Sequence, residues 1–346
     1  MRYKLLGKSG LRVAELCLGT MTFGQEWGFG ADKEGSRKVF DAYVEAGGNF
    51  IDTATNYTDG SSEKFVGDFV SSNRDALVVA TKYTMNEKAR DINNSGNQRK
   101  NLRRSLEESL RRLKTDYIDL YWVHSRDFVT PIEEVMRALD DMVRAGKVLY
   151  VGISDSPAWV VSQANTLAEL RGWTPFVGLQ IRYSLVERSP ERELLPMARA
   201  LDIGVTPFQV LAEGILTGKY SQKDALEKGR IAGSDKIKSE RALAIAEEVV
   251  KVAKEIGCSP SQVALSWVRQ QPGVMIPILG ARSVAQIKDN LGCLGVTLTE
   301  DQMRRLDEVS KISLGFPHEF LASDHIKAEM FSSRFSDVDR HRGESW

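Results

Sequence analysis

The stretch Tyr117–His124 reads YIDLYWVH. A run of aliphatic and aromatic side chains of this length is typical of a buried β-strand, and His124 follows where that strand would surface. His124 is also the only histidine before residue 318. Because an imidazole can donate, accept or carry a proton near neutral pH, a histidine at the end of a buried strand is a candidate for catalysis.

Two further runs end on ionisable residues in the same way. Phe50-Ile51-Asp52 ends on a carboxylate with Tyr57 five positions later, and Leu77–Thr81 is followed by Lys82. If these strands lie side by side, the carboxylate, the phenol, the ammonium and the imidazole of His124 converge at one edge of the sheet. That convergence is the functional hypothesis.

Short apolar runs alternate with amphipathic segments along the chain. Those with the composition of strands are Glu15–Leu18, Phe50–Asp52, Leu77–Thr81, Tyr117–Val123, Val148–Gly152, Phe176–Ile181, Gly204–Phe208 and Val274–Pro277. Those with the spacing of helices are Asp32–Ala46, Ser61–Val70, Gln98–Leu113, Pro131–Ala145, Pro157–Arg171, Pro190–Ala200, Ser239–Ile256 and Val284–Leu291. We also expect a hairpin over Arg2–Val13 and helices starting at Ser259-Pro260 and at Thr299, where Thr299 and Gln302 form a capping-box pattern.

Repeated strand–helix units favour a closed barrel over a doubly wound sheet. A dinucleotide-binding doubly wound sheet would usually carry GxGxxG, and the nearest candidate, Gly28–Lys33, lacks the third glycine. We therefore predict an α/β chain folded as a (β/α)8 TIM barrel, with an N-terminal β-hairpin and extra C-terminal helices, as a single domain over residues 1–346. The tail, about residues 312–346, is expected either to cover the barrel mouth or to fray, and Gly214–Lys238 to act as a lid.

Composition narrows the class of protein. Hydrophobic residues make up 42% of the 346 positions, and 47 basic residues balance 47 acidic ones. No overall field favours nucleic acid or an anionic membrane, so we expect a small-molecule partner. Neither a signal peptide nor a bilayer-spanning run is evident, which predicts a cytoplasmic protein. Cys17, Cys258 and Cys293 lack CxxC spacing, so we expect reduced thiols and no metal site.

The four candidate side chains suit the reduction of a carbonyl group. Hydride transfer to a carbonyl carbon leaves charge on oxygen, which a neighbouring acid must protonate. Tyr57 would be that acid, with its pKa tuned by Lys82, while Asp52 holds the buried ammonium in place. His124 would orient the substrate oxygen and share the proton-donor task.

Taken singly, each residue also has an ordinary structural explanation. A strand-terminal aspartate or lysine is commonly part of a salt bridge, and a tyrosine commonly packs in a core with its hydroxyl bonded. In an aldolase, Lys82 would instead be a Schiff-base nucleophile. All four residues at the ends of three successive strands favour a shared site.

The order of these residues resembles the catalytic tetrad of the aldo-keto reductase superfamily. Asp52-x-Ala54-x-x-Tyr57, Lys82 and His124 carry the resemblance, which extends over nearly the whole chain. The supporting motifs, each weak alone and specific in this order, are Leu6–Val13, Leu18–Gly24, Leu113–Leu120, Gly152–Asp155, Gln180–Leu185, Gly214–Lys219 and Leu279–Ser283. The pattern is most similar to the long-chain, bacterial-type and potassium-channel β-subunit-like branch.

The resemblance implies an NADP-dependent oxidoreductase that reduces aldehydes or ketones to alcohols, with NADPH preferred over NADH. It makes Asp52, Tyr57, Lys82 and His124 catalytic, with Tyr57 the proton donor. Trp27, in the loop after the first strand, is expected either to line an aromatic substrate pocket with Tyr57 and His124 or to pack at the surface or in a lid. The cofactor contacts that it implies are Thr20, Met21, Asp52, Ser154, Asp155, Gln180, Phe208, Gln209, Leu211, Glu213, Gly214, Lys219, Arg230, Gly280, Arg282, Gln286 and Asn290.

The implied contacts fall into three groups, one for each part of the cofactor. Ser154, Asp155 and Gln180 would bond the nicotinamide carboxamide, and Phe208 would stack on the ring. Backbone of Leu211–Gly214 and the side chain of Lys219 would receive the pyrophosphate. Arg282, Gln286 and Asn290 would contact the 2′-phosphate and adenine, where a guanidinium suits a phosphate dianion.

Three positions depart from the family pattern. Asp155 stands where Asn is common, Gln209-Val210 follow Phe208 where Ser-Pro is common, and Asp289 stands where Glu is usual. These departures leave the tetrad intact, so they bear on cofactor affinity and selectivity. An alternative function is an NADPH-binding accessory or sensor protein of the channel β-subunit type with slow turnover. The physiological substrate, the preferred direction and the choice between monomer and homo-oligomer stay open at this stage.

Overall fold

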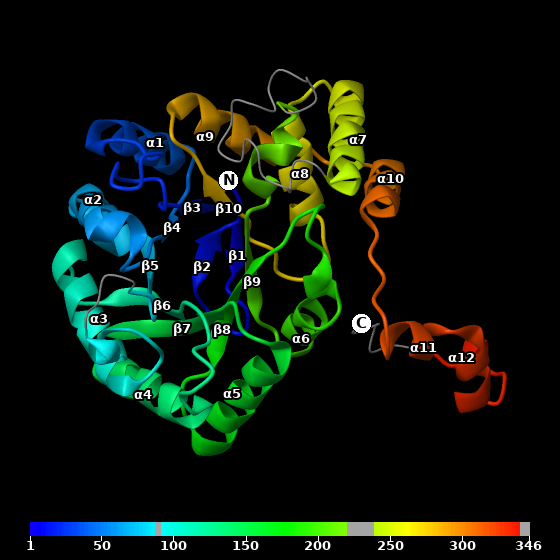
Figure 1. Cartoon of the computed structure of the whole chain (residues 1–346), viewed down its shortest axis with the longest axis horizontal. Helices are drawn as coiled ribbons and strands as arrows, with labels where there is room; N and C mark the ends of the chain where they lie inside the picture. Colours follow the sequence, from blue (N-terminus) through cyan, green and yellow to red (C-terminus); the bar gives the residue numbers. More distant parts are fainter. Residues whose placement is uncertain (87–90, 220–238, 340–346) are drawn as a thin grey trace.

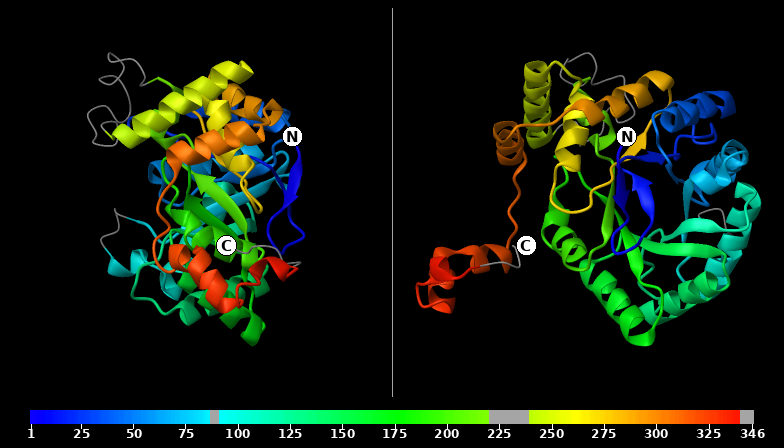
Figure 2. Two further views of the ribbon diagram at one scale, coloured as in Figure 1. Left: turned by 90° about the vertical axis from the view of Figure 1, so that its right-hand side faces the viewer. Right: turned by 180° about the vertical axis from the view of Figure 1, so that it is seen from behind.

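A computed structural model describes residues 1–86, 91–219 and 239–339. Its centre is a sheet of parallel strands in the order β10-β3-β4-β5-β6-β7-β8-β9 (Figures 1 and 2). The strands are β3 (Cys17–Gly19), β4 (Phe50–Asp52), β5 (Val78–Tyr83), β6 (Ile118–Val123), β7 (Val148–Ser154), β8 (Phe176–Arg182), β9 (Gly204–Phe208) and β10 (Ile278–Gly280). A parallel bridge between Val205 of β9 and Met275, just before β10, joins the two edges of the sheet. The predicted (β/α)8 barrel is therefore confirmed.

Helices surround this barrel (Figure 1). They are α1 (Lys33–Glu45), α2 (Ser61–Val70), α3 (Arg99–Leu113), α4 (Ile132–Arg144), α5 (Ala158–Arg171), α6 (Leu194–Ala200), α7 (Glu240–Ile256), α8 (Pro260–Arg269), α9 (Val284–Leu291), α10 (Glu300–Ser310), α11 (His318–Ala322) and α12 (Asp324–Met330). Several begin with a side chain that accepts a hydrogen bond from a free backbone N–H of the first turn. The predicted capping box of Thr299 and Gln302 is present at the start of α10.

Strand alternation divides the core into an inner and an outer part. On β6, Leu120 and Trp122 belong to the cluster inside the barrel, whereas Tyr121 and Val123 pack outward against the helices. The predicted hairpin, β1 (Tyr3–Leu5) with β2 (Arg12–Ala14), contributes to the inner cluster through Leu6 and Val13. Backbone of Gly7 approaches the start of β9, so this hairpin closes the amino end of the barrel and leaves the carboxyl end for a site.

Trp122 forms a floor beneath that open end. Its indole is fully buried. A Cβ atom placed on Gly152 of β7 or Gly178 of β8 would come within 2.4 or 2.7 Å of the indole ring, respectively. The two glycines therefore make room for a large side chain inside the barrel, directly under the strand ends that carry the candidate residues.

Two predicted elements were placed wrongly. The last strand is not Val274–Pro277 but Ile278–Gly280, because the chain bonds to β9 through Val274 and Ile276 and to β3 from the carbonyl of Pro277 onward. Pro277 lies at this change of partner and has no N–H to continue a ladder. The predicted helix Pro190–Ala200 is split into a 3-10 turn at Ser189–Glu191 and helix α6, because Glu193 has the non-helical φ of −134°.

The tail lies beside the barrel. Helices α11 and α12 project away from it in both figures. Arg192 donates to the carbonyl of Ser313, and His318 contacts Glu193 at 3.1 Å. No described residue after Asn290 lines the large cavity at the mouth, and whether the tail covers that mouth or frays stays a prediction. Among the described residues, no helix has the length and apolar character needed to cross a bilayer.

Candidate active site

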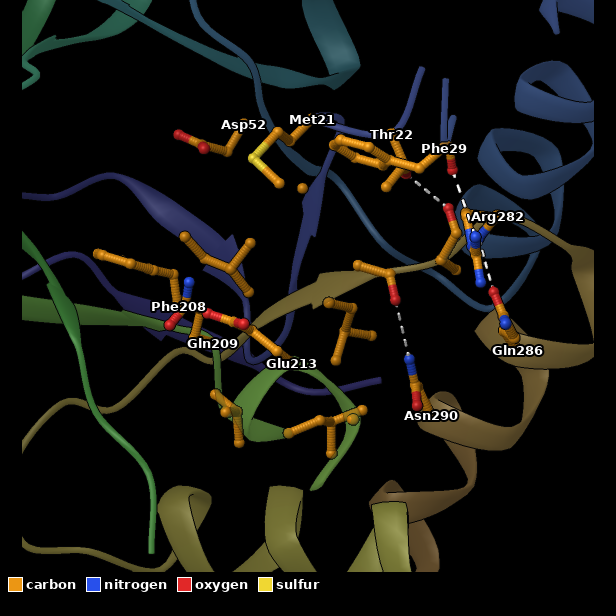
Figure 3. Close-up of a pocket in the computed structure, with 18 of the residues that line it drawn as sticks. Met21, Thr22, Phe29, Asp52, Phe208, Gln209, Glu213, Arg282, Gln286 and Asn290 are labelled. Carbon is orange, nitrogen blue, oxygen red and sulfur yellow. Dashed lines mark hydrogen bonds between the residues drawn. The ribbon is translucent and has the colours of Figure 1, made fainter. Parts of the chain in front are cut away.

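A cavity of about 720 Å³ opens at the carboxyl ends of the strands. It extends from Asp52 on one side to Arg282 and Asn290 of the α9 region on the other (Figure 3). The volume lies within the range of about 300–1,000 Å³ that is usual for small-molecule sites. Three of the four predicted catalytic residues, Asp52, Tyr57 and His124, and most of the predicted cofactor contacts therefore face one space, and Lys82 is buried behind them.

The structure brings Asp52, Lys82 and Tyr57 into direct contact. Lys82 Nζ lies 2.5 Å from Asp52 Oδ2 and donates to the carbonyl of Thr53 at 2.7 Å and to the Tyr57 hydroxyl at 3.2 Å. The other carboxylate oxygen of Asp52 accepts from Gln180 Nε2 at 3.2 Å. Since β4 and β5 are paired in register, the convergence predicted from their ends is what the fold produces.

Burial and charge act in opposite directions on these groups. Burial alone would lower the pKa of Lys82, but the neighbouring Asp52 and Tyr57 turn the shift upward. Burial raises the pKa of Asp52, and the Lys82 charge partly offsets it. For Tyr57, burial raises the pKa more than the Lys82 ammonium lowers it. Lys82 thus keeps its proton, and Tyr57 stays protonated at neutral pH, as a proton donor must.

His124 completes the group from the end of β6. Its ring meets that of Tyr57 edge to face, with centroids 5.9 Å apart. Burial, with a smaller contribution from Lys82, holds the pKa of His124 well below its usual value. The imidazole is therefore neutral near pH 7, so it can donate an N–H hydrogen bond but does not supply a proton as an imidazolium.

The segment that carries Tyr57 has an unusual backbone. Thr58, Asp59 and Gly60 all have left-handed dihedrals, with φ of 45°, 56° and 89°. Two non-glycine residues in this region cost on the order of 1 kcal/mol each and persist only when their surroundings enforce them. Here Thr58 Oγ1 donates to the carbonyl of Phe23 at 2.6 Å and accepts from the backbone of Ser62 at 3.1 Å. The turn that aims Tyr57 into the cavity is thus held by buried contacts.

A buried ion pair supports the same segment from outside the barrel. Arg112 of α3 donates to Glu63 of α2 at 3.0 Å and to the carbonyl of Thr55 at 2.8 Å. Glu63 is fully buried and accepts from Thr81, the residue before Lys82, at 2.7 Å. Because Thr55 lies two residues before Tyr57, this pair joins the segment that carries the phenol to the strand that carries the ammonium.

Predicted nicotinamide contacts gather beside the tetrad. Ser154 and Gln180 are buried at the ends of β7 and β8, and Phe208 ends β9. Asp155 lines the cavity in a left-handed conformation with φ of 38°, and its side chain is exposed there. The surrounding protein displaces part of its hydration, which raises the pKa of its carboxyl against the charges of Arg182 and Lys82. These residues offer a carboxylate, a hydroxyl and an aromatic face to one planar ring system.

The predicted pyrophosphate loop has a concave backbone. Gln209, Ala212, Glu213 and Gly214 all have positive φ, and most of them line the cavity. Leu211 and the exposed Lys219 line it as well. Successive turns of this kind aim backbone N–H groups toward a shared anion. Arg230 lies outside the described residues.

Predicted adenosine contacts occupy the far end of the cavity (Figure 3). The backbone of Arg282 donates to Gln286 Oε1 at 2.8 Å, and its side chain reaches the carbonyl of Phe29 at 3.4 Å. Asn290 donates to the carbonyl of Gly280 at 3.4 Å. Asp289, one of the departures, is held from α8 by Ser259 at 3.1 Å. Arg282 is exposed and keeps further donors for a phosphate.

Thr20 and Met21 are placed differently from each other. Met21 lines the cavity (Figure 3), whereas Thr20 is buried and does not. The Thr20 hydroxyl donates to the carbonyl of Asp52 at 3.0 Å and contacts Ser62 at 2.8 Å. Its side chain therefore supports the Asp52 end of the strand.

Several cavity residues were missed by sequence reasoning. They are Thr22, Phe29, Asn56, Met85, Val210, Thr217, Ser259, Ser261, Leu265 and Ile278. Most lie in loops or on α8, far along the chain from the strand ends that supplied the prediction. For Asn56, its place next to Tyr57 was the available signal.

The residues of the cavity fit an extended nicotinamide dinucleotide. Asn56 Oδ1 and His124 Nδ1 are buried and have no hydrogen-bond partner among the described residues. Orphaned buried polar atoms are rare and mark places where a ligand or water supplies the missing bond. With a flat aromatic face at one end, a concave loop in the middle and a guanidinium at the other, the cavity offers a suitable group to each part of the cofactor. Among the described residues, no group of three or more His, Cys, Asp or Glu side chains is placed to hold a metal ion.

Comparison with known proteins decides the family. The pattern of the aldo/keto reductase family matches residues 15–311. The chain belongs to the aldo/keto reductase family. It is 39% identical to norsolorinic acid reductase of Aspergillus flavus over 328 residues, which cover 92% of this chain and 83% of that protein. It is also 37% identical to an aryl-alcohol dehydrogenase [NADP(+)] of Phanerodontia chrysosporium over 89% of this chain and 86% of that one.

A third relative matches the chain over a similar share of its length. A putative aryl-alcohol dehydrogenase of Saccharomyces cerevisiae is 36% identical over 93% of this chain and 90% of its own length. Membership of the aldo/keto reductase family makes the chain an oxidoreductase of carbonyl compounds that uses a nicotinamide cofactor. The predicted superfamily is thus confirmed, and the assignment to the channel β-subunit-like branch stays a prediction.

Proposed function

We propose that this aldo-keto reductase interconverts aromatic aldehydes or ketones and their alcohols with NADP(H), and that Tyr57 transfers the proton to and from the substrate oxygen. The observation that carries the proposal is the contact of the Tyr57 hydroxyl with buried Lys82 at 3.2 Å, in a cavity that also holds His124. When bound, the cofactor supplies or accepts the hydride. Everything else in the reaction falls to the side chains of this chain.

Tyr57 acts as the acid in reduction and as the base in oxidation. Its hydroxyl stays protonated at rest because burial outweighs the effect of Lys82 on its pKa. When the hydroxyl gives up its proton, the Lys82 ammonium stabilises the phenolate that remains. Asp52 keeps Lys82 charged and fixed, so the ammonium need not reorganise during proton transfer.

His124 positions the substrate oxygen. Its neutral imidazole donates an N–H hydrogen bond to that oxygen and polarises the carbonyl without competing with Tyr57 as the proton source. Nδ1 of His124 has no hydrogen-bond partner among the described residues, so the ring can take the tautomer that the bound ligand requires. In this proposal Tyr57 transfers the proton and His124 orients the oxygen, which agrees with the lowered pKa of His124; the shared proton-donor role expected from sequence stays a prediction.

Aromatic side chains support an aromatic substrate. Trp27 lies 6.2 Å from the Tyr57 ring and 6.1 Å from Phe29, measured between ring centroids. With His124 and Met85 they make the wall of the cavity beside the tetrad largely apolar and flat. Relatives named for norsolorinic acid and for aryl alcohols agree with a substrate of this class.

Preference for NADPH over NADH is part of the proposal. Arg282 is exposed at the rim, and a planar guanidinium can bond a phosphate dianion through two parallel N–H groups. Gln286 holds the backbone of Arg282, which fixes where the side chain starts. NADH lacks the 2′-phosphate and would leave this side chain without its partner.

A substrate screen tests the proposal. Benzaldehyde, 2-naphthaldehyde, hexanal and a ketose are each offered with NADPH and with NADH, following the absorbance of the reduced nicotinamide. We expect turnover with aromatic aldehydes and NADPH to exceed all other combinations. Absence of turnover with every carbonyl, despite tight NADPH binding, would favour the accessory or sensor protein instead.

An aldolase is distinguished by a chemical trap. Borohydride reduction in the presence of a carbonyl substrate would attach it to Lys82 if that amine formed a Schiff base. We expect no attachment, because a Schiff-base lysine needs a lowered pKa and the contacts with Asp52 and Tyr57 shift that of Lys82 upward.

A further inference from the structure

A second cavity lies outside the barrel, between the loop after β6 and helix α5. Its volume is about 490 Å³, and none of the described residues lines both this cavity and the catalytic one. Val123 of β6 and Ile153 of β7 line it on the strand side, and Val160 and Leu167 of α5 line it on the helix side. Helices α4 and α5 lie next to each other there (Figure 1). This space is therefore separate from the site of the proposed reaction.

The loop that borders this cavity presents apolar side chains to solvent at a cost. Phe128 is 77% exposed and has a left-handed φ of 65°, and Val129 is 83% exposed. A bulky residue in that conformation is an outlier and points to a functional constraint. An exposed phenyl ring gains nothing from burial that would repay the strain.

Buried and half-buried polar contacts enforce this conformation. Asp127 accepts from the backbone of Val129 at 3.1 Å and of Thr130 at 2.9 Å. It also accepts from the backbone of Asn97 at 2.7 Å, while its own N–H donates to Asn97 Oδ1 at 2.8 Å. Asn97 in turn donates to the carbonyl of Ser125 at 2.8 Å. The loop is thus built to hold Phe128 outward.

A cation lies between the exposed aromatic rings. The guanidinium carbon of Arg126 is 4.6 Å from the ring centroid of Trp159 and 5.8 Å from that of Phe128. Trp159 is itself 60% exposed. In the part of the chain that the structure describes, no carboxylate pairs with Arg126, and the nearby Glu133 faces Arg171 at 3.6 Å. The cavity therefore combines aromatic and aliphatic walls with the guanidinium of Arg126, and the one carboxylate among its described lining residues, Glu133, is paired with Arg171.

We propose that this second cavity binds a planar aromatic anion, such as an aromatic carboxylate. The rings of Trp159 and Phe128 offer stacking surfaces, the strand and helix side chains exclude water, and Arg126 pairs with the anionic group. The ligand would lie behind the loop that begins at His124, outside the catalytic cavity.

Isothermal titration calorimetry with 2-naphthoate tests this site, using the full chain saturated with NADP⁺. A Trp27→Ala background weakens binding in the catalytic cavity, so that the remaining equivalent reports on the second one. We expect Arg126→Gln and Trp159→Leu each to weaken this binding by about tenfold or more. Both side chains are partly exposed, so both variants should fold, and circular dichroism on heating verifies it.

A control variant and a control ligand show which results would contradict the proposed anion site. Arg137 of α4 also lies over an aromatic ring, 5.9 Å from Trp173, but it does not line the cavity. The control variant Arg137→Gln should therefore leave the binding of 2-naphthoate unchanged. The uncharged 2-naphthamide should bind at least about tenfold more weakly than 2-naphthoate. Equal affinity of the amide, or unchanged binding in both Arg126→Gln and Trp159→Leu, would overturn the proposal.

Discussion

At one end of the catalytic cavity Lys82 is fully buried among Asp52, Thr53 and Tyr57. At the other end Arg282 is exposed, and among the described residues its side chain makes one hydrogen bond, of 3.4 Å, to the carbonyl of Phe29. The first end is held by contacts from several strands and helices. The second consists of polar side chains presented by one loop and one helix. Rigid placement suits bond making, and an open rim suits capture of a charged cofactor. Substitutions at the two ends should therefore change different kinetic constants.

The largest effect is expected at Lys82. Lys82→Met should lower kcat by about 10²- to 10⁴-fold, because the phenolate of Tyr57 loses its stabilising charge. It should also destabilise the fold by about 3–5 kcal/mol, since Asp52 is left as an unpaired buried carboxylate. Chemical denaturation of the double variant Asp52→Asn/Lys82→Met should recover much of the stability while kcat stays low. Recovery of both together would show that Lys82 acts through the fold alone.

The next largest effect on kcat is expected at the ion pair of Arg112 and Glu63, outside the barrel. Arg112→Lys should lower kcat by about ten- to hundredfold while the Kd of NADPH stays within about twofold, because it loosens the Tyr57 segment and leaves the rim intact. Steady-state kinetics and cofactor fluorescence measure the two quantities.

Arg74→Lys is the matched control for that variant. Arg74 pairs with Asp119 at 2.6 Å near the amino ends of the strands, where both side chains are largely buried. It should lose comparable stability and keep its kcat. An equal fall in kcat for both variants would mean that Arg112 is merely structural.

A smaller and more selective effect is expected at the exposed end. Arg282→Gln should weaken NADPH binding by about ten- to hundredfold, because it removes a charge-assisted hydrogen bond to the 2′-phosphate. The kcat at saturating NADPH should not change. Binding of NADH should not change. The control is Lys288→Gln, since Lys288 is an exposed cation of helix α9, which follows Arg282, and does not line the cavity. A matching loss for NADH would refute the role in phosphate selection.

The smallest effect is on stability as a function of pH. The pKa of His124 is lower in the folded chain than in the unfolded chain. Below a pH of about 6.5, His124 is therefore protonated in the unfolded chain while it stays neutral in the folded one. Wild type should therefore lose stability relative to His124→Gln as pH falls from 7.5 to 5, by at most about 2 kcal/mol. Denaturation at several pH values measures this difference. Parallel curves for the two proteins would show that His124 titrates normally.

The meeting of the four candidate residues could be predicted because each lies near the carboxyl end of a strand or in the loop that follows it. Parallel strands in register deliver their carboxyl ends to one rim, so Asp52, Lys82 and His124 needed only the strands to be recognised. Tyr57 was harder, since its direction depends on the left-handed turn at Thr58 and Asp59, which pattern reasoning does not reveal.

Other features depend on contacts between distant parts of the chain. Arg112 and Glu63 form a pair across 49 residues, and Ser259 reaches Asp289 from another helix. No local pattern marks such partners. Strand β10 was misplaced for a related reason, because the chain exchanges one neighbouring strand for another at Pro277.

Turnover of Tyr57→Phe, measured together with its NADPH affinity, tests the proton-donor assignment most directly. The variant keeps the ring that packs against Trp27 and His124 and loses only the hydroxyl that contacts Lys82. We expect unchanged NADPH affinity and a kcat lower by about 10²- to 10⁴-fold with an aromatic aldehyde. A kcat close to that of wild type would contradict the account.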